Sequence, residues 1–258
     1  MKYIEGIEKA FKEYIGEHSI NELKNSITKK PMILIAGDQL TGKSTQAKRL
    51  SKKYNGKNLS VGTLFREEAK RRGVSVAEQA RLLKKERGID VQIDYSTCKM
   101  IGGFELDANL AVIEGRQPAF MGGFMESLGK EGLVRIYLEC TVREQALRFL
   151  KRETTKEDYL FVKDKLPEED FENLEDVAKE IDKLAIPNTK SVMKAFIDNQ
   201  NRDEDDRERY HKLYGFDYRD RSGYDIIINT TNKEVENVAK EIVEAIEKYD
   251  SLWIERRP

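Results

Sequence analysis

The stretch "MILIAGDQLTGKST", residues 32–45, decides the fold. Its first five residues form a continuous apolar run that ends in a glycine, as expected of a strand buried on both faces of a parallel sheet. The Gly-x4-Gly-Lys-Ser pattern of a phosphate-binding loop follows from Gly37 to Ser44. A helical pattern then runs from Lys43 to about Tyr54, so the loop has the strand-to-helix context that phosphate binding requires.

Further apolar runs extend this pattern along the chain and are separated by helical stretches. A sheet whose strands alternate with helices is parallel and covered on both faces. We therefore predict an α/β protein with a doubly wound, five-stranded parallel sheet, built on a phosphate-binding loop. The expected strands are the opening run and "NLSV" (58–61), "LAVIEG" (110–115), "LVRIYLE" (133–139) and "YDIIINT" (224–230).

Composition limits the class of protein. Charged residues make up 36% of the 258 residues and the net charge is -1, which argues against general attraction to nucleic acid or to an anionic membrane. We find no apolar run of membrane-spanning length and no signal peptide. Cys98 and Cys140 stand far apart in no paired motif, so we expect neither a disulfide scaffold nor a cysteine-based zinc site. A reducing cytoplasm fits this composition.

Three segments go beyond the bare sheet-and-helix core. Residues 1–30 are predicted to be an N-terminal helical extension that packs on the main domain, which covers 31–258. Residues 62–104 are expected to be mostly helical, with a capping pattern at Ser75–Glu78. A long excursion separates the last two strands, and Pro167 with the acids after it predicts a helix start. An apolar stripe from Phe171 to Leu184 indicates local packing.

The loop residues fit the triphosphate of a nucleotide. A glycine-rich turn directs backbone N–H groups and the positive end of a helix dipole at an anion. In such a loop the lysine reaches the β- and γ-phosphates and the serine hydroxyl binds Mg²⁺. We therefore expect ATP and Mg²⁺ as cofactors, with Ser44 as the metal ligand and ATP bound by Gly37, Asp38, Gly42, Lys43, Ser44 and Thr45.

Arginines recur in four segments, as a reaction that transfers a phosphoryl group requires. Two of these segments follow expected strands, at the sheet edge where ligands bind. A third is a helix with two arginines four residues apart, and a fourth is a charged helix whose Arg-x3-Asp-x2-Arg spacing puts three groups on one side. The residues are Arg66, Arg116, Arg148, Arg152, Arg202, Asp206 and Arg209. We interpret the charged helix as part of a mobile lid.

Together these segments resemble the cytidylate kinases, most closely their short archaeal type. The resemblance covers most of residues 31–248 and is carried by "GKST", "SVGTLFREEAKRRGVSVAE", "IDVQID", "VIEGR", "LRFLKRE", "RDEDDRERYHKLYGFD" and "YDIIINTT". It implies transfer of the γ-phosphate of ATP to CMP or dCMP. It also implies a monophosphate-binding segment at 62–104, an enlarged lid at 150–215 and small-molecule nucleotides as the partners.

The resemblance also implies roles for individual residues. Arg66 and Arg116 would bind the acceptor monophosphate, while Arg148 and Arg152 would embrace the transferring phosphoryl group together with Lys43. Arg202, Asp206 and Arg209 would serve the acceptor and the phosphates, and the Asp206 carboxylate would accept from the amino group of cytosine. Glu114, at a strand end, would either order Mg²⁺-bound water or be an ordinary strand-end acid.

The chain departs from the family at three places. Leu40 stands where the loop usually has a third glycine, Gln145 stands where a lid arginine is usual, and residues 154–197 are inserted where the lid is short. Two alternatives stay open: a P-loop kinase for another nucleotide or small metabolite, and a non-catalytic nucleotide-binding protein. A GTPase is disfavoured because Val235 occupies the aspartate position of an Asn-Lys-x-Asp motif.

Overall fold

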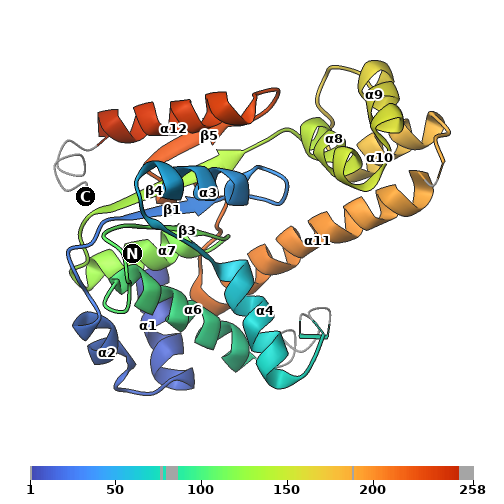
Figure 1. Ribbon diagram of the computed structural model, residues 1–258. Coiled ribbons are helices and arrows are strands. Elements are labelled where there is room, and N and C mark those ends of the chain that lie inside the picture. The colour runs from blue at the N-terminus through green and yellow to red at the C-terminus, as the bar shows by residue number, and fades with distance from the viewer. Residues whose placement is uncertain (1, 76–77, 80–86, 188, 250–258) are drawn as a thin grey trace.

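A computed structural model describes residues 2–75, 78–79, 87–187 and 189–249 (Figure 1). Its centre is a five-stranded sheet of order β2-β3-β1-β4-β5. Every pairing in the sheet is parallel, which confirms the predicted class. The strands are β1 (Met32–Ala36), β2 (Lys57–Ser60), β3 (Ala111–Glu114), β4 (Leu133–Glu139) and β5 (Ile226–Asn229).

Helices cover both faces of the sheet, and alternate residues of β1 pack into the two cores that result. Ile33 and Ile35 pack with α3 (Lys43–Lys53) and α12 (Val235–Tyr249). Met32, Leu34 and Ala36 belong to the opposite core, which holds residues of α1 (Lys2–Tyr14), α2 (Ser19–Asn25), α6 (Arg87–Gly102) and α7 (Pro118–Ser127). The sheet is therefore doubly wound, with β1 where the chain switches direction.

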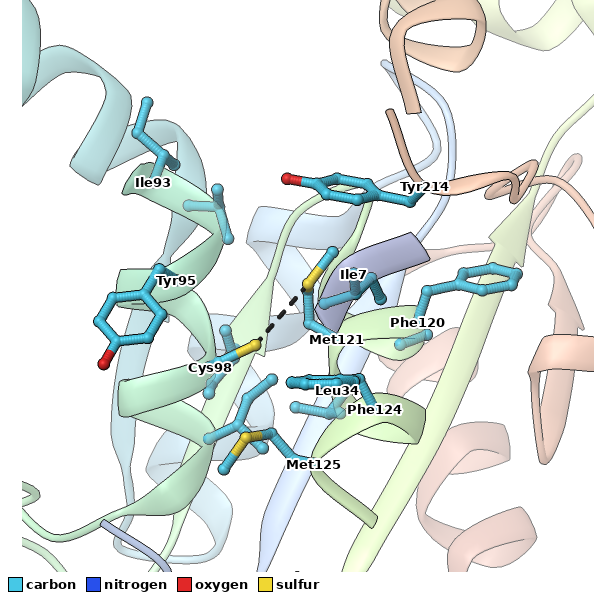
Figure 2. Close-up of a cluster of buried hydrophobic side chains, with 14 of the residues drawn as sticks. Ile7, Leu34, Ile93, Tyr95, Cys98, Phe120, Met121, Phe124, Met125 and Tyr214 are labelled. Atoms are coloured by element: carbon cyan, nitrogen blue, oxygen red, sulfur yellow. Dashed lines mark hydrogen bonds between the residues drawn. The ribbon is translucent and has the colours of Figure 1, made fainter. Parts of the chain in front are cut away.

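The N-terminal helix is part of this second core. Ile7 and Phe11 of α1 are fully buried, and the Phe11 ring makes edge contacts with Tyr95 and Phe124. This confirms a helix that packs on the main domain, as the apolar spacing predicts. Figure 2 shows the interior of the same core, where Cys98 of α6 faces Met121 of α7 at a sulfur–sulfur distance of 3.7 Å. Cys98 and Cys140 are both free thiols.

The excursion between β4 and β5 forms a lobe with a core of its own. The lobe consists of α8 (Val142–Glu153), α9 (Lys156–Lys165), α10 (Leu174–Lys183) and the N-terminal half of α11 (Thr189–Tyr214). Figure 1 shows it standing apart from the sheet, with α11 running from the lobe back towards α6 and α1. We call this unit the inserted lobe. A short 3-10 turn, η1 (Arg221–Gly223), precedes β5.

Three local predictions are corrected or confirmed by the structure. The helix expected at Pro167 begins instead at Leu174, because the Asn173 side chain caps it by accepting from the Asp176 N–H. The apolar stripe does pack locally, with Val177 and Ile181 buried in the lobe core. In the 62–104 segment, α4 (Val61–Arg72) and α6 are helical as expected.

The capping pattern at Ser75–Glu78 is described at its two ends, where the Glu78 N–H donates to Ser75 Oγ at 3.1 Å. Residues 76–77 between them lie outside the described part of the chain. None of the helices over the described ranges has the length and apolar character that crossing a membrane would need.

Candidate active site

The loop after β1 has the backbone that the glycine pattern predicts. Gly37 and Gly42 have φ angles of 144° and 95°, in the region that favours glycine. A Cβ at Gly37 would lie 2.3 Å from the Leu138 carbonyl oxygen, so a larger residue cannot fit there. Gly42 is the N-cap of α3, which begins at Lys43. The first N–H groups of α3 therefore face the space above the sheet edge.

Leu40, the unusual residue of the loop, adopts the conformation that its glycine counterpart would adopt easily. Its φ angle is 65°, in the left-handed region that costs a leucine about 1–2 kcal/mol. Two contacts offset this cost. The side chain is half-buried against the core of the inserted lobe, and Arg148 Nη1 donates to the Leu40 carbonyl oxygen at 2.8 Å.

The loop lysine is held inside the loop itself. Lys43 Nζ donates to the Asp38 carbonyl oxygen at 2.5 Å, and burial lowers the pKa of the ammonium, aided by the nearby Arg116 charge. The Asp38 carboxylate is used elsewhere, since it accepts from Tyr218 Oη at 2.6 Å and from Arg219 Nε at 3.0 Å. Asp38 thus supports the loop through its side chain and does not line the pocket described next.

A pocket of about 710 Å³ opens at the carboxyl ends of β1, β2 and β3, between α4, α6 and α11. This is the edge where ligands bind in open parallel sheets. The pocket brings together most of the predicted residues from four separate segments. Those on its wall are Lys43, Ser44, Arg66, Glu114, Arg116, Arg202, Asp206 and Arg209.

Arg116 is the centre of a buried charge cluster in this pocket. It lies just beyond β3, and its Nε donates to Asp203 Oδ1 at 2.6 Å while Nη1 lies 2.8 Å from Asp206 Oδ2. Burial opposes its charge, but the two carboxylates raise the pKa of the guanidinium. Asp206 also pairs with Arg209. Both carboxylate oxygens of Asp206 therefore have an arginine partner, and the base-reading role expected for it stays a prediction.

Two acids of α6 line the opposite end of the pocket, one helical turn apart. Asp94 accepts from Gln117 Nε2 at 2.7 Å and from Tyr214 Oη at 2.6 Å. Asp90 lies 3.0 Å from Arg209 Nε, but neither of the two facing atoms has hydrogen-bond geometry to a partner among the described residues. Burial raises the pKa of Asp90 to about 7 and that of Asp94 to about 6.

Two predicted arginines of α8 lie outside the pocket. Arg148 braces the loop: besides Leu40 it donates to the Thr230 carbonyl oxygen at 2.7 Å and to Glu144 at 2.9 Å. Arg152 is exposed, paired with Glu153 and packed over the Phe149 ring at 5.0 Å. Arg152 therefore lies away from the pocket, and its expected contact with the transferring phosphoryl group stays a prediction. Gln145, in the usual arginine position, is buried and accepts from Gln200 Nε2 of α11.

Some pocket residues were missed by the sequence analysis. Asp90 and Asp94 carried a signal, because two acids four residues apart inside a largely apolar helix share one face. Gln39 on the pocket wall carried none, nor did Asp203, which lies behind the wall and contacts Arg116. Asp203 is one acid among many on α11, and only the direction of that helix turns it to the loop. Gly37, Gly42 and Thr45 belong to the loop but are absent from the pocket wall.

The donor set at the loop fits Mg²⁺ bound mainly through phosphate oxygens. Ser44 and Glu114 supply a hydroxyl and a carboxylate to the same pocket, and hard oxygen ligands are those that Mg²⁺ prefers. In the described part of the chain, no three His, Cys, Asp or Glu side chains cluster as a metal site. When bound, Mg²⁺ would neutralise charge on the β- and γ-phosphates.

A parallel sheet with this loop after its central strand, and arginines at the neighbouring strand ends, defines a P-loop kinase fold. A family model described as AAA domain matches residues 40–165, from the middle of the loop to the end of α9. The solved structure of an uncharacterised protein from Eubacterium ventriosum is similar in fold, with a TM-score of 0.51 and 16% identity over 84% of this chain and 98% of that one.

The curated relatives that this chain resembles are cytidylate kinases. The cytidylate kinase of Desulfurococcus amylolyticus is 29% identical over 85% of this chain and 97% of its own length. That of Pyrococcus horikoshii is 28% identical over 86% and 92%, respectively. The resemblance to the archaeal cytidylate kinases is thus confirmed over most of the chain, and it supports a phosphotransferase of the nucleoside monophosphate kinase type.

Proposed function

We propose that the protein transfers the γ-phosphate of ATP, bound with Mg²⁺, to CMP or dCMP. The observation that carries this proposal is the single pocket that joins the loop residues Lys43 and Ser44 to the two strand-end arginines, Arg66 and Arg116. A donor phosphate bound at the loop and an acceptor phosphate bound by the arginines would meet in that space. Positioning of this kind supplies most of the catalysis in phosphoryl transfer.

The reaction requires no strong general base, because the acceptor is already a phosphate anion. One of its oxygens would attack the γ-phosphorus while the bond to the β-phosphate oxygen breaks and ADP leaves. Lys43, Arg116 and Arg202 supply positive charge around the transferring group, which spreads its negative charge over three oxygens. Arg148 contributes indirectly, by holding the loop through the Leu40 carbonyl oxygen.

The far end of the pocket favours a base that carries an amino group. Carboxyl oxygens of Asp90 and Asp94 lie there as buried acceptors, and Asp94 is oriented by Gln117 and Tyr214. A carboxylate accepts from the N4 amino group of cytosine, whereas uracil presents an acceptor at the same position. Acceptors buried in a fixed orientation discriminate strongly against a ligand that leaves them unpaired.

A coupled assay of ADP formation across CMP, dCMP, UMP, AMP and dTMP tests the proposal. We expect turnover with CMP and dCMP and at least about tenfold lower kcat/KM with UMP. Good turnover with another acceptor but none with CMP or dCMP would leave a kinase of different specificity. Binding of ATP without transfer to any acceptor would instead show a non-catalytic nucleotide-binding protein.

A further inference from the structure

The carboxylate of Asp203 lies on the phosphate-binding loop. Its Oδ2 accepts from the Gln39 backbone N–H at 2.8 Å, and its Oδ1 accepts from Arg116 Nε at 2.6 Å. The side chain is 1% exposed, so these are buried contacts. Asp203 belongs to α11, far along the chain from the loop, and only the tertiary fold brings it there.

These contacts use the groups that a phosphoryl group would use. A loop N–H and a buried guanidinium are anion donors, and a carboxylate presents to them two oxygens much as a phosphate does. The Lys43 ammonium, which serves phosphate in such loops, interacts electrostatically with the same carboxylate. Asp203 is therefore an anion of the protein itself, in an anion-binding position.

The inserted lobe keeps Asp203 in this place. Just before Asp203 on α11, the Asn199 carbonyl oxygen accepts from Gln39 Nε2 at 2.5 Å. The Leu40 side chain packs against the lobe core, to which Phe196 of the same helix belongs. Both residues at the tip of the loop are thus in contact with the lobe or with α11. The unusual leucine is explained as the loop's contribution to this interface.

We propose that Asp203 is an internal competitor for the phosphoryl position of the loop, held there by the lobe, and that α11 must withdraw it before nucleotide phosphates bind. The proposal rests on the proposed function only in requiring that the loop binds ATP. It accounts for the inserted lobe as a device that restrains nucleotide binding. The apparent affinity for nucleotide is then proportional to the fraction of molecules whose loop is free.

Calorimetric binding of MgATP in the absence of any acceptor tests this directly. Asp203→Asn keeps the shape and removes the charge, so we expect MgATP to bind at least about fivefold more tightly, at the lower end of ordinary coupling between sites. Asp198→Asn is the matched control: Asp198 is an exposed acid of the same helix and its replacement should leave the affinity unchanged. Unchanged or weaker binding by Asp203→Asn would overturn the proposal.

Amide hydrogen exchange of the wild-type protein gives a second test that needs no variant. MgATP should increase exchange in residues 199–206 of α11, because that segment leaves the loop. Slower exchange there would mean that α11 closes on the nucleotide, and would overturn the proposal. If neither wild type nor variant binds MgATP, both proposals fail; if the wild type transfers phosphate but the variant's affinity is unchanged, only this one fails.

Discussion

The two ends of the pocket differ in how far their polar groups are already satisfied. At the loop end, the Gln39 N–H and the Lys43 ammonium have partners within the protein, and so has the Arg116 guanidinium where the two ends meet. At the acceptor end, Asp90 Oδ2 and Arg209 Nε are buried 3.0 Å apart as an ion pair, but neither makes a hydrogen bond among the described residues. Leaving buried polar atoms without hydrogen bonds costs free energy, and a bound ligand can supply the missing hydrogen-bond partners. The acceptor end is thus formed in advance, whereas the loop end must rearrange.

The largest effect is expected at the loop. Lys43→Ala removes the cation that we propose neutralises the transferring phosphoryl group, so kcat for ADP formation should fall about 100- to 1000-fold. Lys48→Ala, at an exposed position on the same helix, is the control and should leave kcat within about twofold. A Lys43→Ala variant with wild-type turnover would show that phosphate transfer does not use this loop.

The next largest effect is expected where the two ends meet, at Arg116. Arg116→Lys replaces a guanidinium that contacts both Asp203 and Asp206 by a single ammonium, which cannot bridge them in the same way. We expect acceptor kcat/KM to fall about 10- to 100-fold and the melting temperature to drop.

Arg66→Lys is the matched control for this substitution. Arg66 is exposed and donates to Thr63 Oγ1 at 2.8 Å, so it is not part of the buried cluster. The proposed function assigns it to the acceptor phosphate. Its replacement should lower kcat/KM by less than about tenfold and leave the melting temperature unchanged. If both variants lost the same stability, Arg116 would be no more important for the fold than Arg66.

A smaller effect, with a pH signature, is expected at Asp90. Its folded-state pKa of about 7 lies above the usual value of 3.8, so the folded protein binds more protons than the unfolded chain between these pH values. The free energy of unfolding should therefore decrease as pH rises through this window. Asp90→Asn removes that loss, so its melting temperature should gain a few degrees on the wild type between pH 5 and pH 8.

The same variant should change acceptor choice. An amide in place of the Asp90 carboxyl offers one acceptor and adds donors, so kcat/KM for CMP should fall about tenfold while the value for UMP falls less or rises. Asp107→Asn, outside the pocket, is a control for the loss of one negative charge. An unchanged CMP-to-UMP ratio would place base recognition elsewhere.

The smallest effect is expected at Arg152. Its guanidinium is exposed and pairs with the neighbouring Glu153, so Arg152→Ala should change kcat by less than about twofold. Arg148→Ala, one turn earlier on α8, should cost more, because it frees the Leu40 carbonyl oxygen. A loss above about tenfold for Arg152→Ala would show that the lobe closes over the phosphates and would restore the catalytic role expected from the sequence.

The sequence predicted the sheet and the loop because both are local patterns. The β4 run Leu133–Glu139 was predicted with its exact bounds, and the strand-end positions of Arg66 and Arg116 were sufficient to place them in the pocket. The spacing of Arg148 and Arg152 could not tell which one meets the loop, since that depends on how α8 packs in the lobe. The role of Asp203 depends on the path of α11 across the molecule, for which no local pattern exists.

The packing of Leu40 has a consequence for protein engineering. A loop carrying this leucine, transplanted into a kinase with a short lid, would keep the left-handed backbone but leave the side chain in water. Conversely, the lobe placed over a glycine loop would have an unfilled gap in its surface. A chimaera should therefore exchange residues 37–45 and the inserted lobe together, as one transferable unit.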